Sequence, residues 1–322
     1  MAKETKLFDS FGRRIYYLRI SVTDRCNLRC IYCMPAEGVP WIPHSEILSY
    51  EEIVSIVKIA VELGFTKIRL TGGEPLVRAG LPDFIKMLLR IDGIDEISLT
   101  TNGTLLKKYA LELKQSGLRR VNISLDTLKA DRYRHITRLG NLKDALDGIE
   151  AAQDADLHPK INIVVMRGIN EDETLDFAKQ TYQGWDVRFI ELMPFTKAAE
   201  YVPAEELQQQ IGYLGALEPC FVGGNGPAEY YRLPEAKGTI GFIAPVSKPV
   251  CLYCNRMRLT SNGQIRSCLL SDDGIDLKGL LRSNASHQQI RQLMLQAVAS
   301  KPKYHPVLEN ISLKSNMSRI GG

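Results

Sequence analysis

The sequence lacks any apolar run long enough to cross a membrane, and its first residues lack the apolar core of a signal peptide. It also lacks a Lys/Arg tract interleaved with aromatic side chains, and its formal net charge is only +4. These absences argue against a membrane protein and against a nucleic-acid-binding protein. We therefore expect a cytoplasmic globular protein with no membrane or nucleic-acid partner. A local basic pocket for an anionic small molecule accounts equally well for the small positive excess.

Cysteine is scarce outside two short groups. Cys26, Cys30 and Cys33 form the first group, and Cys251, Cys254 and Cys268 form the second. A disulfide framework would spread its cysteines along the chain, whereas grouped cysteines in a cytosolic protein more often bind metal. The seventh cysteine, Cys220, is expected to be a buried structural thiol.

The first group has the spacing C-x3-C-x2-C, within the run from Asp24 to Pro35. Three thiolates can hold three irons of a [4Fe–4S] cube and leave the fourth iron open to a small molecule. A closed zinc site needs four ligands instead, and no further Cys or His stands nearby in the sequence. The spacing therefore predicts a cluster with one vacant corner.

The second group has the spacing C-x2-C-x13-C and again offers three ligands. A zinc site is a stronger alternative here, because C-x2-C is common in zinc ribbons and His287 could supply a fourth ligand. Arg256 and Arg258 stand between these cysteines at alternate positions, as on a strand that presents both guanidinium groups to one anion. The alternative for them is solvated surface charge, and their place between two cluster ligands favours a function.

Strand-like and helix-like segments alternate along the first two thirds of the chain. Strands are predicted at 16–22, 66–71, 96–101, 120–125, 160–166 and 186–192, with helices between them. Ser49 and Glu52 form a capping box at the start of the first helix, and Gly64 ends it. Six β-then-α units predict an α/β fold with a parallel sheet, a partial (β/α)6 TIM-type barrel, since eight units would close a full barrel.

Five of these strands alternate apolar and polar residues, so that each has one apolar and one polar face. Arg19, Arg69 and Lys160 lie on the polar faces, which converge on the lumen once helices cover the apolar faces. Burying such cations without partners would be costly. We therefore expect a wet lumen that receives a polar, anionic ligand. The alternative, an antiparallel sheet with one solvated face, conflicts with the intervening helices.

The pattern of alternating segments changes after Pro194. We predict that residues 1–194 form the barrel with its N-terminal segment and that residues 195–235 form a connecting region. Residues 236–322 are predicted to form an α+β extension that carries the second cluster. Within it, Asn262-Gly263 is a hairpin signal.

The cysteine loop and the run Thr71-Gly-Gly-Glu-Pro75 resemble the corresponding segments of the radical S-adenosylmethionine (SAM) enzymes. In that superfamily the amino and carboxylate groups of SAM chelate the open iron. The reduced cluster then cleaves SAM to methionine and a 5′-deoxyadenosyl radical, which abstracts a hydrogen atom. The resemblance implies that Tyr32 and Met193 lie near the adenine, that Gly73 and Glu74 bind the amino group, and that Ser124 contacts the carboxylate or ribose.

Further motifs narrow this resemblance. They are Leu70–Arg78, His135–Arg138, Arg167–Asn170, Arg188–Pro194, Gly241–Ile243, Cys251–Leu259 and the terminal Gly321-Gly322. In this order they are similar to the motifs of the molybdenum cofactor biosynthesis protein A family, the GTP 3′,8-cyclases. The resemblance covers nearly the whole chain and is weakest over about residues 195–235.

Membership of that family implies a lyase with two [4Fe–4S] clusters and SAM. The radical would take the C3′ hydrogen of GTP, and the C3′ radical would attack C8 of guanine, giving (8S)-3′,8-cyclo-7,8-dihydro-GTP for molybdenum cofactor biosynthesis. The open iron of the second cluster would hold the guanine base. The residues implied around GTP are Arg19, Arg69, Thr100, Lys160, Arg256 and Arg258. Gly321 and Gly322 would reach into the active site, where a bulkier side chain would not fit.

The family resemblance also implies partners. A reductant protein of unknown identity would supply electrons, a downstream cyclic pyranopterin synthase would take the product, and the family allows a homodimer. Two rivals remain open. One is a peptide-modifying radical SAM enzyme with an auxiliary cluster, although such enzymes usually carry more C-terminal cysteines and lack the Arg-x-Arg between them. The other is a zinc-stabilised binding module built on the second cysteine group.

Overall fold

A computed structural model describes residues 6–195, 199–223, 226–304 and 317–320 of the chain. Its strands form one twelve-stranded sheet in the order β12-β11-β10-β1-β2-β3-β4-β5-β6-β9-β8-β7. The strands are β1 (Tyr17–Ser21), β2 (Lys67–Thr71), β3 (Glu96–Thr101), β4 (Arg120–Ser124), β5 (Lys160–Val165), β6 (Asp186–Glu191), β7 (Glu218–Pro219), β8 (Glu229–Arg232), β9 (Ile240–Ile243), β10 (Arg256–Leu259), β11 (Gln264–Arg266) and β12 (Ile275–Asp276). The helices are α1 (Tyr50–Leu63), α2 (Leu81–Leu89), α3 (Leu106–Gln115), α4 (Ala130–Thr137), α5 (Leu142–Asp154), α6 (Thr174–Lys179), α7 (Ala204–Gly212), α8 (Lys278–Arg282), α9 (His287–Ala299) and α10 (Met317–Ile320).

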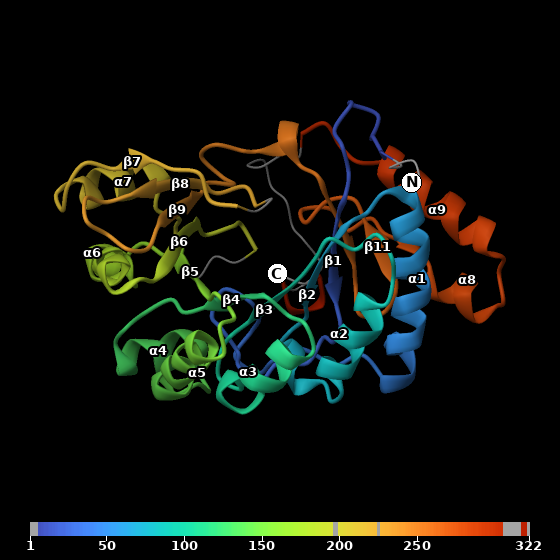
Figure 1. The fold of residues 1–322 in the computed structure, drawn as a ribbon, viewed down its shortest axis with the longest axis horizontal. Coiled ribbons are helices and arrows are strands. Elements are labelled where there is room, and N and C mark those ends of the chain that lie inside the picture. Colours follow the sequence, from blue (N-terminus) through green and yellow to red (C-terminus); the bar gives the residue numbers. More distant parts are fainter. Residues whose placement is uncertain (1–5, 196–198, 224–225, 305–316, 321–322) are drawn as a thin grey trace.

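The six strands predicted from the sequence are present as β1 to β6, each with bounds within one residue of the prediction. Neighbouring strands pair in parallel and in chain order. Helices α1 to α6 lie along the outer face of this curved sheet (Figure 1). The partial barrel of six βα units is therefore confirmed.

Helix α1 shows how the local sequence sets the bounds of these units. The Ser49 hydroxyl accepts a hydrogen bond from the Glu52 amide at 3.1 Å, and the Glu52 carboxylate accepts one from the Ser49 amide at 2.7 Å. Gly64 ends the helix with φ 106°, a left-handed conformation that glycine adopts without a Cβ penalty. Both predicted signals are confirmed.

The chain after Pro194 joins the sheet at both edges. Strand β9 pairs in parallel with β6, and β10 pairs in parallel with β1. Strand β10 then turns at Asn262-Gly263 into the antiparallel β11, which confirms the predicted hairpin. As a result, the C-terminal segments stand directly beside the first and last strands of the barrel. The domain boundaries at residues 194 and 235 stay a prediction.

The alternation of the strands sorts their side chains between two environments. Most apolar residues of β1 to β6 are buried with those of the covering helices in one continuous core, whereas Val164 and Ile190 are only partly buried and lie on the concave side of the sheet. The opposite, polar faces point into the concave side of the sheet, as expected. Cys220 is half-buried where we expected a buried thiol, because it follows β7 at the outer end of the sheet, where only β8 pairs with it.

Helix α10 lies near the middle of the molecule, apart from the outer helices α8 and α9 that precede it in the chain (Figure 1). The terminal Gly321 and Gly322 lie outside the described residues, as does part of the predicted linker after Phe195. Among the helices that the structure describes, none has the length and apolar character needed to cross a membrane.

Candidate active site

One cavity of about 340 Å³ extends along the concave face of the parallel strands, from their carboxyl ends, where such sheets bind ligands, to Arg13 before β1 and Cys254 before β10. Its walls include both cysteine groups, although more than half of the chain separates them. The lining cysteines are Cys26, Cys30, Cys33, Cys251, Cys254 and Cys268. All of them are free thiols. The fold thus brings together the two groups that the sequence analysis singled out.

The first cysteine loop follows β1 and is held in place by helix α4. The Arg29 amide donates to the Thr137 carbonyl at 3.0 Å, and the Ile31 amide donates to the Ile136 carbonyl at 2.9 Å. The Arg138 guanidinium donates to the carbonyls of Arg29 and Met34, both at 2.9 Å. These bonds fix the loop on either side of Cys30 and Cys33.

Without a bound metal, the cysteines of the first group strongly favour the protonated thiol over the thiolate. Burial raises the pKa of Cys26 to about 11. Burial and the nearby Cys26 raise the pKa of Cys33 to about 12, and burial followed by Cys33 raises that of Cys30. Iron binding must therefore supply the free energy that deprotonates them.

Two glycines let the loop after β2 lie against the cysteine loop. A Cβ on Gly72 would stand 2.7 Å from the Thr23 carbonyl oxygen, and one on Gly73 would stand 2.3 Å from the Arg25 carbonyl oxygen. Both distances are too short for any side chain, so glycine is required at both positions. Both glycines line the cavity, as predicted for Gly73.

Glu74 is placed differently from Gly73. Its side chain is buried, with the residue 1% exposed, and is not part of the cavity wall. Its carboxylate accepts hydrogen bonds from the Thr101 hydroxyl and the Asn102 amide, both at 2.7 Å, and burial raises its pKa to about 7. Thr101 and Asn102 do line the cavity. Direct SAM binding by Glu74 stays a prediction, and its observed contacts are those of a residue that positions the cavity wall.

The predicted adenine contacts lie at the cavity. The Tyr32 hydroxyl donates to the Asp126 carboxylate at 2.7 Å, and the other Asp126 oxygen accepts from the Val164 amide at 2.8 Å. Burial raises the pKa of Asp126 to about 6. Tyr32 is thereby fixed between the cysteine loop and the ends of β4 and β5. Ser124 and Met193 also line the cavity, from β4 and from the segment after β6.

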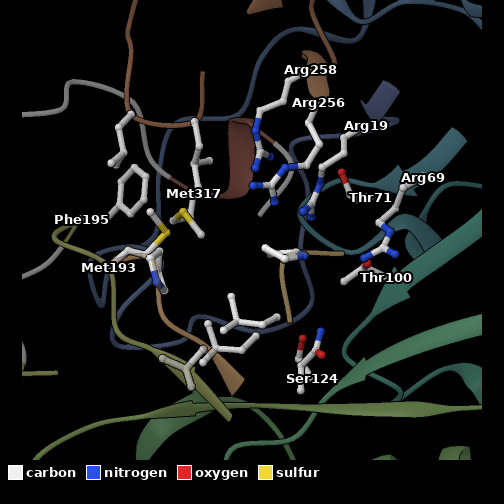
Figure 2. A pocket seen from close by; sticks show the side chains of 18 of the residues that line it. Arg19, Arg69, Thr71, Thr100, Ser124, Met193, Phe195, Arg256, Arg258 and Met317 are labelled. Carbon is white, nitrogen blue, oxygen red and sulfur yellow. The ribbon is translucent and has the colours of Figure 1, made fainter. Parts of the chain in front are cut away.

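A row of arginines covers the wall formed by β10, β1 and β2. In the sheet register Arg19 lies opposite Arg258 on one side and opposite Arg69 on the other. Figure 2 shows these three side chains together with Arg256, while Met193 lies across the cavity from them. Burial and the neighbouring Arg258 lower the pKa of Arg19, and burial and Arg256 lower that of Arg258 to about 10. This concentration of positive charge favours an anionic ligand.

Two further cations extend this charge beyond the row. Arg188 on β6 lines the cavity, donates to the Asn122 side chain and has its pKa lowered to about 10 by burial. The sequence analysis did not select it, although it alternates with Val187 and Phe189 as the other polar-face residues do. Lys160 is buried at the start of β5 outside the cavity wall, with its Nζ 5.1 Å from the centre of the Tyr230 ring.

Unsatisfied polar atoms also point to a missing ligand. The Thr100 hydroxyl and the Asn162 side-chain oxygen are buried and have no hydrogen-bond partner among the described residues. Both residues line the cavity. Buried polar groups rarely lack partners, so these two atoms fit a site that is completed by a bound molecule.

The second cysteine group comes from the segment before β10 and from the segment after β11. Cys251 begins the short helix η5 (Cys251–Tyr253), Cys254 precedes β10, and Cys268 follows β11. Burial raises the pKa of Cys254, but the nearby Arg256 and Lys301 cations and hydrogen bonds from Arg256 outweigh it and lower the pKa to about 6. The lowered pKa of Cys254 therefore favours the thiolate, the form that binds metal.

The donor set fits clusters better than single metal ions. Within the part of the chain that the structure describes, no three His, Cys, Asp or Glu side chains surround a position suited to one ion. The thiolates of a cube bind different irons and stand farther apart than the ligands of one zinc ion. His287 is exposed, pairs with Glu62 at 3.1 Å and does not line the cavity, so it is not placed to complete a zinc site.

The chain just before the terminal glycines reaches the cavity. Met317 lines it, and the Ile320 carbonyl accepts a hydrogen bond from Arg258 at 3.4 Å. The predicted role of Gly321 and Gly322 falls outside the described residues. Their predecessors nevertheless bring the tail to the arginine row.

Two family models match the chain. The model described as "Radical SAM superfamily" matches residues 20–181, and the model described as "Molybdenum Cofactor Synthesis C" matches residues 185–307. The first ends after α6, and the second takes in β6 and the strands that join both edges of the sheet. Each model therefore contains one of the two cysteine groups.

Curated relatives match over nearly the full chain. A protein of Pelotomaculum thermopropionicum named "GTP 3′,8-cyclase" is 52% identical over 98% of this chain and 99% of its own length. Proteins of the same name from Thermodesulfovibrio yellowstonii and Moorella thermoacetica are each 49% identical over 98% of this chain and 99% of their own lengths.

Solved structures share the fold. SuiB of Streptococcus suis matches with a TM-score of 0.62 over 91% of this chain and 68% of its own, at 16% identity. The structure of SuiB bound to S-adenosylmethionine matches with a TM-score of 0.61 over 87% of this chain and 69% of its own, at 15% identity. At these identities the likeness concerns the fold alone.

Proposed function

The chain belongs to the radical SAM superfamily and, within it, to the GTP 3′,8-cyclases, and on this premise we propose that it converts GTP into 3′,8-cyclo-7,8-dihydro-GTP for molybdenum cofactor biosynthesis. One observation carries the proposal: two cysteine trios and a row of arginines line the same cavity. SAM cleavage alone requires only the first trio. The second trio and the arginines provide a place for an anionic substrate beside it.

The first trio holds a [4Fe–4S] cluster through Cys26, Cys30 and Cys33. When bound there, the cluster and SAM supply a one-electron reductive cleavage that yields a hydrogen-abstracting radical. The protein's own residues position SAM. Gly73 leaves space at the loop after β2, and Tyr32, held by Asp126, limits the movement of the bound nucleoside.

Ser124 and Met193 complete the proposed SAM site from the end of β4 and from the segment after β6. The Ser124 hydroxyl can donate to the carboxylate or ribose, and the Met193 side chain can pack against the adenine. Glu74 keeps Thr101 and Asn102 in place through its two 2.7 Å hydrogen bonds. In this proposal Glu74 affects SAM through those neighbours.

The triphosphate of GTP is proposed to lie against the arginine row. Arg19, Arg69, Arg256 and Arg258 offer planar guanidinium groups, which match phosphate oxygens with paired hydrogen bonds. Burial and the repulsion from neighbouring arginines lower the pKa values of Arg19 and Arg258, and a bound triphosphate would relieve that repulsion. Thr100 supplies a hydroxyl that has no partner among the described residues, so it gains a hydrogen bond when the ligand binds.

Two other cations have smaller proposed roles. Arg188 reaches the cavity from β6 and adds a further phosphate or ribose contact. Lys160 does not line the cavity, so its proposed contribution is positive charge at longer range. Ordering the substrate in this way places the ribose between the two cysteine groups, where the hydrogen atom must be removed.

We propose a second [4Fe–4S] cluster at Cys251, Cys254 and Cys268, with the guanine base at its vacant corner. The support is that all three thiols line the cavity, and that the described residues lining it include no His and no Cys beyond the two cysteine groups. The lowered pKa of Cys254 favours the thiolate that iron requires. On the family resemblance, Gly321 and Gly322 are proposed to act in this site; they follow Ile320, whose carbonyl accepts a hydrogen bond from Arg258.

The reaction also requires partners, which remain proposals. A reductant protein of unknown identity would reduce the first cluster, and a downstream cyclic pyranopterin synthase would consume the product. A homodimer and a cytoplasmic location, where thiols stay reduced, are proposed on the family resemblance.

One experiment tests the proposed function directly. The protein is reconstituted anaerobically with iron and sulfide, reduced, and incubated with SAM, with and without GTP, and 5′-deoxyadenosine and the cyclic nucleotide are quantified. We expect both products to form in quantity only with GTP. Formation of 5′-deoxyadenosine that GTP does not stimulate, with no cyclic product, would contradict the proposal. ATP in place of GTP is the control for a general effect of a nucleotide triphosphate.

A further inference from the structure

Lys301 is a buried cation outside both cysteine groups. It follows helix α9, is only 4% exposed, and lines the cavity beside the thiols of Cys254 and Cys268. Among the described residues no Asp or Glu forms an ion pair with it. A buried ammonium group without an acidic partner is costly, so it needs either strong hydrogen bonds or a negative group that is absent from the protein itself.

The hydrogen bonds of Lys301 connect the two strands of the second cysteine group. Its Nζ donates to the Arg256 carbonyl at 2.9 Å and to the Ser267 carbonyl at 2.6 Å. Arg256 lies two residues after Cys254, and Ser267 lies directly before Cys268. One side chain therefore sets the separation between two of the three thiols.

Arg13 does the same for the remaining cysteine. Its Nη1 donates to the Cys251 carbonyl at 2.7 Å, and its Nη2 donates to the Pro302 carbonyl at 2.7 Å. Its Nε pairs with the Asp9 carboxylate at 2.5 Å, and the residue is only 8% exposed. Arg13 thus ties Cys251 to the residue that follows Lys301.

We propose that Arg13 and Lys301 form one clamp that positions Cys251, Cys254 and Cys268 for the second cluster, with the Lys301 ammonium balancing the negative charge of that cluster. This inference rests on the second cluster of the proposed function. Both are positioning residues that act through backbone carbonyls, and neither is an iron ligand. The clamp joins the beginning of the described chain to two segments near its end.

The charge of a cluster explains why a lysine occupies this position. A [4Fe–4S] cube with thiolate ligands is anionic, and one-electron reduction adds a further negative charge. An ammonium beside two of the thiolates stabilises both states, and the reduced state more. Removing the charge should therefore lower the midpoint potential of the cluster as well as weaken its retention.

The test compares Lys301→Met and Arg13→Gln with Lys303→Met. Lys303 lies two residues after Lys301 in the same segment but is exposed, so its variant controls for the loss of a lysine there. Each protein is reconstituted anaerobically and assayed for iron and sulfide per chain. Two cubes correspond to about eight irons and one cube to about four. We expect about eight in the wild type and Lys303→Met, and about four in Lys301→Met and Arg13→Gln.

Further measurements separate the clamp from general unfolding. Circular dichroism of the metal-free variants reports the fold, and 5′-deoxyadenosine released slowly under dithionite without GTP reports the first cluster. We expect both to resemble the wild type. Lys301→Arg, which keeps the charge and several donors, should restore most of the missing iron. In Lys301→Met preparations that retain some second cluster, its midpoint potential should fall.

Three results would count against the inference, and they differ from one another. Four irons in the wild type would remove the second cluster and the clamp with it. Eight irons in the wild type and in both clamp variants, with an unchanged midpoint potential, would leave the second cluster standing and overturn the clamp alone. If one variant did not fold, the other would decide by the same iron count. Equal loss in Lys303→Met would also refute the specific role of Lys301.

Discussion

Replacing Arg258 by Met tests how the arginine row binds its ligand. Arg258 is 5% exposed, lies opposite Arg19 in the sheet register and lines the cavity. Methionine keeps much of the side-chain length but removes the charge and every donor. A charge-assisted hydrogen bond contributes about 1.5–3 kcal/mol. The loss of one such bond should therefore raise the dissociation constant of GTP roughly 10- to 150-fold.

In the absence of GTP, Arg258→Met should leave the stability of the fold nearly unchanged or raise it. Burial and Arg256 lower the pKa of Arg258, which means that its charged form is disfavoured where it stands. Removing the charge relieves that penalty, while the hydrogen bond to the Ile320 carbonyl is lost. We expect the unfolding temperature of the metal-free, GTP-free variant to stay near that of the wild type or to rise.

Anaerobic equilibrium dialysis of the reconstituted protein with labelled GTP measures the affinity, at two salt concentrations. The matched control is Arg266→Met, because Arg266 lies opposite Arg258 on β11 but does not line the cavity. Arg256→Met should behave as Arg258→Met does, and both should weaken the salt dependence. Unchanged GTP affinity in both variants, or equal loss in Arg266→Met, would refute the assignment of the row to the triphosphate.

The remaining predictions concern the scaffold. Gly73→Ala should lower the unfolding free energy by about 3 kcal/mol or more and reduce iron retention, because its Cβ would stand 2.3 Å from a carbonyl oxygen of the cysteine loop. In Gly212→Ala, where nothing lies within 4 Å, thermal unfolding should show no loss. Arg138→Met removes two hydrogen bonds to the cysteine loop, so iron analysis should show weaker binding at the first cluster, whereas the exposed Arg134→Met should match the wild type. Burial lowers the pKa of Lys160 to about 8. Below about pH 8 Lys160 is charged in both the folded and the unfolded protein, so burial of the charge destabilises the fold by its full amount. Between about pH 8 and about pH 10 Lys160 keeps its proton only in the unfolded protein. The contribution of Lys160 to the unfolding free energy should therefore rise with pH over this range. Chemical denaturation should show this rise in the wild type relative to Lys160→Met, and parallel curves would contradict it.

The sequence predicted the barrel well because its signals are local. Strand-like segments located β1 to β6, and the period-two alternation of the first five placed Arg19 and Arg69 on the face that became the cavity wall. It could have identified Arg188, which stands between Val187 and Phe189 in the same pattern. A polar residue between buried apolar neighbours on a parallel strand is thus a usable signal for the lumen.

Other parts of the fold carry weak local signals. Helix α4 has a weak sequence signal, because it is short and only Tyr133, Ile136 and Thr137 of its residues are buried. Strands β9 and β10 are short, and their partners β6 and β1 are distant in the chain. Tertiary packing decides which edge of the sheet each strand joins, and a short sequence pattern does not predict it.

The clamp residues were beyond prediction for a related reason. Arg13 and Lys301 stand outside any motif, and each acts on backbone carbonyls of the second cysteine group. Every residue has a backbone carbonyl, so the sequence does not indicate which carbonyls these two side chains contact. Glu74 shows the opposite case, since a motif suggested a ligand contact and the structure gives the carboxylate other partners.

The most direct test of the account follows a hydrogen atom from one substrate to the other. GTP carrying deuterium at C3′ is incubated with SAM and the reduced, reconstituted protein, and 5′-deoxyadenosine is analysed by mass spectrometry. Because both cysteine trios line one cavity, SAM and the ribose of GTP should meet there, and deuterium should appear in 5′-deoxyadenosine. Release of unlabelled 5′-deoxyadenosine alongside unreacted, fully deuterated GTP would contradict the account.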